Sequence, residues 1–205
     1  MIKTLKIYPA VLLVFSLTFL IYFPAIEGEF IWDDDLHLTE NQHLKIEEGL
    51  KIIWLNPGAT VQYYPLVFTS FWLENRLWGD NPTGYHVINL LLHTSSALLL
   101  WRLLILLSVP GAGLTALIFL IHPVNVESVA WITERKNTLS GLFYLASLSF
   151  YLRFLQLEHL PSSQKKKIQK KNNGLFYILS ITSFLMALLS KTATCTLPAV
   201  FLLII

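Results

Sequence analysis

Residues 85–107, YHVINLLLHTSSALLLWRLLILL, decide the fold of this chain. Arg102 is the only fixed charge in this run, and the run exceeds the about 20 apolar residues that a membrane-spanning helix needs. Similar apolar runs lie on both sides of it. Together they predict helices at about 7–23, 85–107, 112–134, 139–157, 175–190 and 193–205. The sequence therefore predicts an all-α polytopic membrane protein.

The composition of the chain supports the membrane class. Apolar residues make up 54% of the 205 residues and charged residues 14%, whereas a soluble domain carries about 25% charged residues. One cysteine excludes a disulfide scaffold, and a net charge of +2 without a basic face excludes a nucleic-acid-binding protein. No cleavage site precedes Pro24, so residues 7–23 are expected to be a retained helix. The last run reaches Ile205 without a cap, so we expect a truncated helix and the N-terminal part of a longer protein.

Residues 24–83 contain no long apolar run and form a loop domain, with short helices predicted at 46–55 and 66–78. Positive residues stay on the cytoplasmic side of a membrane. With the N-terminus inside, the inner ends of the helices collect nine bases against the single acid Glu158: Lys3, Lys6, Arg102, Arg153, Lys165, Lys166, Lys167, Lys170 and Lys171. The loop domain, with ten acids and three bases, then lies outside. This orientation suits a bacterial inner membrane or the endoplasmic reticulum.

Three adjacent aspartates, Asp33, Asp34 and Asp35, follow Trp32 about ten residues beyond the first helix. Their charges repel one another unless a cation, a hydrogen-bond donor or a proton relieves them. One of them is therefore a candidate general base for a hydroxyl nucleophile, and the three together are possible ligands of a divalent cation. The alternative is an acidic surface turn or a helix cap.

His86, Asn89, His93 and Ser96 recur at steps of three, four and three residues, which places them on one helical face. Polar groups are costly in lipid, so this polar stripe is expected to face the bundle interior or a wet cavity. The helix carries no acidic or cysteine partner for the two histidines, so hydrogen bonding between helices is favoured over a zinc site.

The predicted helix 112–134 contains a proline after His122, and proline removes a backbone donor and kinks a helix. A kink is therefore predicted at Pro123. Continued helix beyond it is expected to bury Glu127 and to aim its carboxylate toward Arg135 and Lys136. The alternative for these charges is a simple ion pair at the helix end.

The order of the motifs along the chain resembles one known family. The motifs are Phe30-Ile31-Trp32-Asp33-Asp34, Tyr63-Tyr64-Pro65-Leu66, Trp78-Gly79, Gly84-Tyr85-His86, Asn89-Leu90 with His93, His122-Pro123 with Glu127 and Arg135, and Leu189-Ser190-Lys191. In this order the chain resembles the transmembrane and tetratricopeptide-repeat-containing proteins, which are polytopic O-mannosyltransferases of the GT-C class. Thr192 departs from the acidic residue or proline that this family often has after the lysine. The chain shows no internal period of 34 residues, so tetratricopeptide repeats, if any, are expected beyond residue 205.

The resemblance implies a GT-C-type helix bundle whose large first extracytoplasmic loop carries the acidic motif, matched here by Asp33 and Asp34. It implies a membrane glycosyltransferase that moves a sugar, mannose in this family, from a polyprenyl-phosphate donor to a protein Ser or Thr hydroxyl. The expected partners are the lipid-linked donor, the protein acceptor and membrane lipid, with no nucleic acid. The residues expected to support the donor phosphate or the site are His122, Glu127, Arg135 and Lys136.

Two other classes of protein stay open from the sequence. A noncatalytic membrane anchor of a repeat protein has no need of the residues 32–35. A polytopic transporter would use the polar stripe and Glu127 as its pathway, and its carboxylates would lie near the centres of several helices. The acids of this chain gather in the loop instead, which favours the enzyme.

Overall fold

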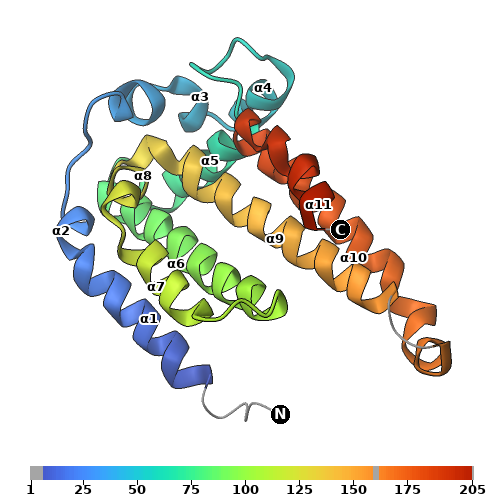
Figure 1. Cartoon of the computed structure of the whole chain (residues 1–205). Helices are drawn as coiled ribbons and strands as arrows, with labels where there is room; N and C mark the ends of the chain where they lie inside the picture. Colours follow the sequence, from blue (N-terminus) through green and yellow to red (C-terminus); the bar gives the residue numbers. More distant parts are fainter. Residues whose placement is uncertain (1–6, 159–161, 205) are drawn as a thin grey trace.

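A computed structural model describes residues 7–158 and 162–204 (Figure 1). The described residues are helical, with no strand among them. The α-helices are α1 (Ile7–Ile21), α2 (Phe23–Ile26), α3 (Gln42–Lys45), α4 (Gly49–Leu55), α5 (Pro65–Trp78), α6 (Pro82–Leu106), α7 (Ala112–Ile121), α8 (Val126–Ala130), α9 (Arg135–Glu158), α10 (Ser162–Ser190) and α11 (Leu197–Ile204). Shorter helical turns are η2 (Asp35–Thr39), η3 (Pro123–Asn125), η4 (Ile132–Glu134) and η5 (Thr192–Thr196).

Two of these helical segments, Pro82–Leu106 and Ile132–Leu155, are long and apolar enough to cross a membrane. A third candidate span combines Ala112–Ile121 with Pro123–Ala130, and its two halves meet at 50°. The kink predicted at Pro123 is thereby confirmed. The other predicted segments contain shorter apolar helices, Val11–Ile21, Gly174–Ser190 and Thr192–Leu203, and their crossing of the membrane stays a prediction.

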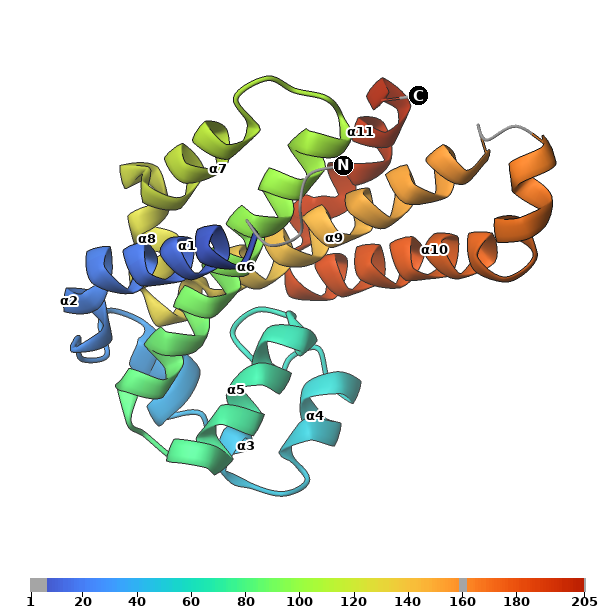
Figure 2. The ribbon, with the colours of Figure 1, turned by 90° about the horizontal axis from the view of Figure 1, so that it is seen from below.

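Helices α3 to α5 of the loop domain cover one end of the helix bundle, at the top of Figure 1. Figure 2 shows the same helices from below, with α9 and α10 side by side and α1 next to α6. A shared apolar core joins the loop domain to α6, η4 and α9, and its buried members are Leu38, Leu44, Ile53, Val67, Phe68, Phe71, Tyr85, Ile132 and Leu139. Burial of such a core against the bundle fixes the position of the loop domain.

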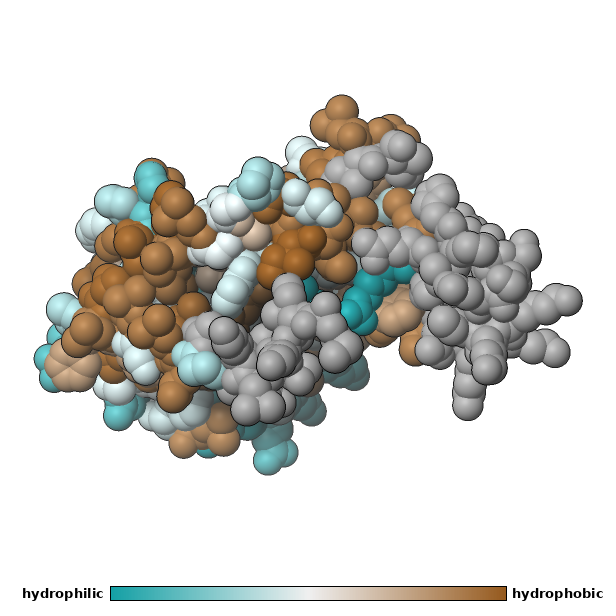
Figure 3. Space-filling model, turned by 60° about the horizontal axis from the view of Figure 1, so that its bottom comes forward, coloured by the Kyte–Doolittle hydropathy of each residue, from teal (hydrophilic) through white to brown (hydrophobic). Residues whose placement is uncertain are grey.

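Apolar side chains are also exposed on the outside of the bundle. Figure 3 shows them gathered over much of the face that it presents. The exposed apolar residues of α1, α7 and α10 include Leu12, Leu13, Leu20, Leu114, Ile118, Leu175, Ile178 and Leu185. Large exposed apolar surfaces are unfavourable in water and suit contact with lipid. This surface agrees with a membrane location of the bundle.

Candidate functional site

The acidic motif begins at a strained residue. Trp32 has a φ of 51°, which a side chain other than glycine rarely adopts, and 74% of the residue is exposed. Its ring packs edge to face on Trp131, with the ring centroids 4.6 Å apart. The π-helix η2 follows directly, and such turns are frequent at functional sites. Strain of this kind persists only where surrounding contacts hold it in place.

Asp34 is the buried member of the motif, with no exposed surface. One carboxylate oxygen accepts the backbone N–H of Ile31 at 3.0 Å, and the other accepts the N–H of Thr133 at 2.9 Å. Burial raises the pKa of Asp34, and these hydrogen bonds oppose the rise. Because Thr133 belongs to η4, Asp34 ties the loop to the start of α9. No substrate hydroxyl can reach a carboxylate held in this way.

Asp33 is accessible, with 42% of its side chain exposed. Its Oδ1 accepts the hydroxyl of Thr133 at 3.0 Å, so one residue of η4 holds both aspartates. The Nδ1 of His37 lies 3.6 Å from Oδ2 of Asp33 and 2.9 Å from its backbone oxygen. His37 is itself buried and stacks on Phe68. Asp33 thus has a fixed position and an oxygen that an incoming hydroxyl can approach, as a general base requires.

The three aspartates do not form the metal site considered from the sequence. Within the described part of the chain, no three His, Cys, Asp or Glu side chains gather in a way that could hold an ion. Both oxygens of Asp34 accept backbone N–H groups, and exposed Asp35 accepts the hydroxyl of Thr39 at 3.2 Å. Calcium and magnesium need several converging oxygen ligands, so we assign no step to a cation.

Arg135 lies where α5, α6 and α9 meet, and it is completely buried. Its guanidinium donates to both carboxylate oxygens of Glu74, to Asn89 Oδ1, to the Ser70 hydroxyl at 3.2 Å and to the Tyr85 carbonyl at 2.9 Å. These contacts satisfy its five N–H donors and join α5, α6 and α9. Arg135 therefore supports the site from behind, with no N–H group left for a donor phosphate.

The predicted polar stripe of α6 lies inside the bundle. His86, Asn89 and His93 are all buried. Asn89 Nδ2 donates to the carbonyl of Trp131 at 3.1 Å, and His93 Nε2 lies 3.0 Å from the carbonyl of Leu120. The His93 bond reaches a carbonyl at the end of α7, and the Asn89 bond reaches the carbonyl that precedes η4. Such side-chain bonds help irregular backbone to be tolerated at membrane depth.

His122 and Glu127 are both exposed, so the expected burial of Glu127 is wrong. His122 Nδ1 accepts the N–H of Val124 at 3.2 Å and caps η3. The chain turns at Pro123 and becomes extended again at Trp131, so no continuous helix carries Glu127 toward Arg135.

Lys136 forms an ion pair with Glu134, with Nζ 2.7 Å from Oε1. An ion pair was the alternative that the sequence left open for Lys136, and the acid that it pairs with is Glu134 in place of Glu127. Asn137 donates to the same glutamate and to the Ser128 hydroxyl at 3.0 Å, and it accepts a hydrogen bond from Lys191. Lys136, Glu134, Asn137 and Lys191 thus form one connected network, which we call the lysine network.

Several residues of the site were not predicted from the sequence: Thr133, Glu74, Ser70 and Asn137. Glu74 carried a detectable signal, because it is a lone carboxylate within the apolar and aromatic helix α5. Thr133 carried none, since its role depends on a contact with Asp33 that spans 100 residues.

The hydroxyl of Thr133 offers a direct test of the site. Thr133→Val removes the bond to Asp33 but keeps the backbone N–H that Asp34 accepts, so the loop should stay docked. A hydrogen bond to a charged group is worth about 1.5–3 kcal/mol, so we expect a drop in catalytic rate of about 10- to 100-fold. Thr133→Ser keeps the hydroxyl and should retain most of the rate. Equal rates for Val and Ser would show that the bond is unimportant.

Together these features define a class: an all-helical membrane protein whose acidic loop is docked on one end of the bundle and holds the accessible Asp33 carboxylate there. Comparison with known proteins gives the relatives. The protein O-mannosyl-transferase tmtc2 of Xenopus laevis is 32% identical over 155 residues, 70% of this chain and 18% of that protein. The human protein O-mannosyl-transferases TMTC2 and TMTC4 are 31% and 29% identical over 65% and 70% of the chain. The chain is homologous to this group of O-mannosyl-transferases.

The homology covers a partial region, since the matches span 17% to 23% of the length of these three relatives. No family model and no solved structure matches the chain. The relationship therefore rests on sequence similarity to these relatives.

Proposed function

We propose that this chain carries the catalytic loop of a membrane glycosyltransferase of the GT-C class. In this proposal the enzyme moves a sugar, mannose by analogy with the names of its relatives, from a polyprenyl-phosphate donor to a protein Ser or Thr hydroxyl. The reaction takes place on the extracytoplasmic side. The observation that carries the proposal is the accessible Asp33 carboxylate, which Thr133 holds at the end of the membrane bundle.

The proposed reaction is a single displacement at the anomeric carbon of the donor. The acceptor oxygen forms the new bond to that carbon while Asp33 takes the hydroxyl proton. The bond from the carbon to the phosphate oxygen breaks, and the phosphate leaves with the bonding electrons. A phosphate leaving group needs no protonation, so one general base suffices, unlike the two carboxylates that hydrolyse a glycoside. The negative charge on the phosphate needs nearby cations, which Lys136 and its network supply.

Transfer of labelled mannose from polyprenyl-phosphate mannose to a Ser- or Thr-containing peptide tests the function. We expect transfer by the full-length protein in membranes or detergent, and none without the lipid-linked donor. A noncatalytic anchor would transfer nothing. A transporter would move a solute across vesicles without forming any glycopeptide, and that result would overturn the proposal.

The orientation in the membrane is a separate prediction, and it rests on the inner bases and the acidic loop. In a chain whose exposed Cys195 is replaced by Ser, single cysteines are introduced at Glu47 and at Gln169. An impermeant thiol reagent applied to intact cells should modify only position 47. Labelling at position 169 would reverse the topology and place Asp33 on the cytoplasmic side, away from the proposed chemistry.

A further inference from the structure

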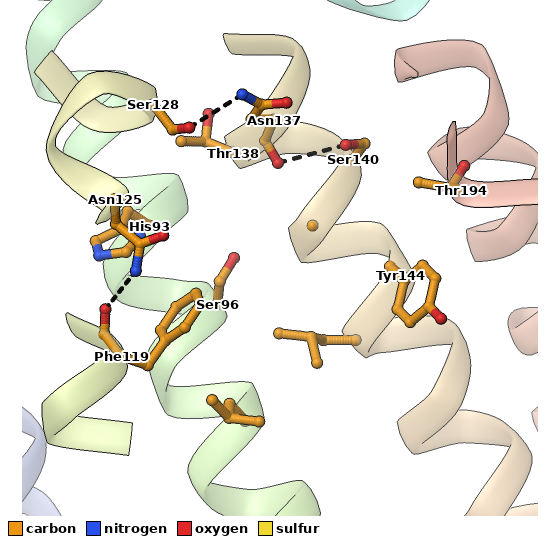
Figure 4. A pocket seen from close by; sticks show the side chains of 13 residues that line it. His93, Ser96, Phe119, Asn125, Ser128, Asn137, Thr138, Ser140, Tyr144 and Thr194 are labelled. Atoms are coloured by element: carbon orange, nitrogen blue, oxygen red, sulfur yellow. Dashed lines mark hydrogen bonds between the residues drawn. The ribbon is translucent and has the colours of Figure 1, made fainter. Parts of the chain in front are cut away.

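A cavity of about 450 Å³ opens between the helices of the bundle, and its lining residues include several polar side chains (Figure 4). Its walls come from α6, α7, α8 and α9, with one contribution each from η3 and η5. The polar lining residues include His93, Ser96, Asn125, Ser128, Ser140 and Tyr144. Polar side chains are costly among membrane-crossing helices, so their presence in the lining marks a space that water or a polar ligand can enter.

The lining groups have mostly used their hydrogen-bond donors. The Ser96 hydroxyl donates to Leu92 O at 2.9 Å, and the Ser140 hydroxyl donates to Asn137 O at 3.3 Å. The Asn125 amide donates to Phe119 O at 2.7 Å, a contact drawn in Figure 4. Hydroxyl oxygens keep their accepting lone pairs after they donate. The polar part of the lining therefore suits a ligand that brings many donors of its own, as the hydroxyl groups of a sugar do.

The lysine network borders this cavity through Asn137, which lines it. The network contains two lysines and the single carboxylate of Glu134. Within the described residues, Lys191 has no carboxylate at ion-pair distance, and it is only partly exposed. Lys191 also stands where α10 ends and the backbone becomes extended before η5. A half-buried excess of positive charge is costly alone and favours a bound anion.

We infer that Lys191 contacts the phosphate of the lipid-linked donor and that the polar side of the adjoining cavity receives the donor's hydroxyl-rich head. This inference rests on the proposed function and adds the binding site of its donor. Lys136 adds positive charge to this site as a member of the lysine network, where it pairs with Glu134. Arg135 does not contact the phosphate, because its N–H groups donate to other residues of the protein.

Binding of undecaprenyl phosphate to the full-length protein in detergent tests the site without any turnover. Charge-assisted hydrogen bonds are worth about 1.5–3 kcal/mol, so Lys191→Met should weaken binding by about 10- to 100-fold. Lys191→Arg keeps the charge and should stay within about fivefold of the parent protein. Glu134→Gln removes the only carboxylate of the network and should tighten binding. Lys51→Met, at an exposed lysine of α4, is the matched control and should bind as the parent does.

Inorganic phosphate and phosphatidylglycerol distinguish the possible sources of the anion. We expect undecaprenyl phosphate to bind more tightly than either, with the dependence on Lys191 strongest for it. Equal loss of phosphatidylglycerol binding in Lys191→Met would make this a general anionic-lipid contact and overturn the inference. Unchanged binding in Lys191→Met, or weaker binding in Glu134→Gln, would also overturn it and leave Lys191 as a helix-terminal residue.

The outcome is separable from that of the proposed function. If the protein transfers sugar while Lys191→Met keeps both its KM for the donor and its affinity for undecaprenyl phosphate, the site is wrong and the function stands. If Lys191 controls binding of undecaprenyl phosphate but no sugar is transferred, the site stands and the enzymatic proposal fails.

Discussion

Asp33→Asn is expected to lower the rate of sugar transfer by about 10²- to 10⁴-fold, the range that a positioned general base contributes. The Asn side chain keeps the size of Asp and still accepts the hydroxyl of Thr133, but it cannot take a proton from the acceptor. Folded yield and binding of undecaprenyl phosphate should therefore stay near those of the parent protein. The measurement is transfer of labelled mannose to a peptide, at saturating donor.

The control for this variant is Glu47→Gln, which removes one negative charge from the same loop at an exposed position. It should change the rate little. Asp34→Asn is expected to act differently, because it places an amide against two backbone N–H donors and loosens the loop, so its folded yield should fall. Parental transfer rates in Asp33→Asn would make the motif a surface turn and favour the noncatalytic anchor.

The sequence predicted the helical class, the apolar segments and the loop domain because each depends on local properties. The composition and length of a run such as 85–107 are enough to predict a membrane-spanning helix. Proline at 123 predicts a kink whatever the surroundings of the helix. The polar spacing of His86, Asn89 and His93 likewise predicts a shared face without knowledge of the fold. Loop helices predicted at 46–55 and 66–78 are observed as α4 and α5 with small shifts at their ends.

The role of each residue in the site could not be predicted, because it depends on contacts between residues that are distant in the sequence. Adjacent Asp33 and Asp34 are chemically identical, and only the docking of η4 makes one accessible and the other buried. Arg135 looked like a phosphate ligand because its partner Glu74 lies 61 residues away in the sequence. The exposure of Glu127 was not predicted, because the chain turns a second time at Trp131, where no proline indicates a break in the helix.

The buried ion pair between Glu74 and Arg135 is expected to carry the second large effect. The pair joins the loop domain to α9, and both side chains are almost fully buried. Arg135→Met leaves the Glu74 carboxylate without a cation in the protein interior, which typically costs about 3–5 kcal/mol. We expect a loss of this size in the free energy of unfolding in mixed micelles, together with low folded yield. Glu74→Gln should lose less, since Arg135 keeps its three other partners.

The double variant Glu74→Leu with Arg135→Met tests whether Arg135→Met destabilises the protein through the unpaired Glu74 charge or through lost packing. Removing both charges eliminates the unpaired group, so the double variant should be more stable than Arg135→Met alone. Lys45→Met is the matched control, because it breaks an exposed ion pair with Asp80 of 3.1 Å in the same loop domain and should cost at most about 1 kcal/mol. If Arg135→Met and Lys45→Met were equally stable, the buried pair would not be what holds the loop on the bundle. The docking of Asp33 would then depend on the apolar core and on the Asp34 bond to Thr133.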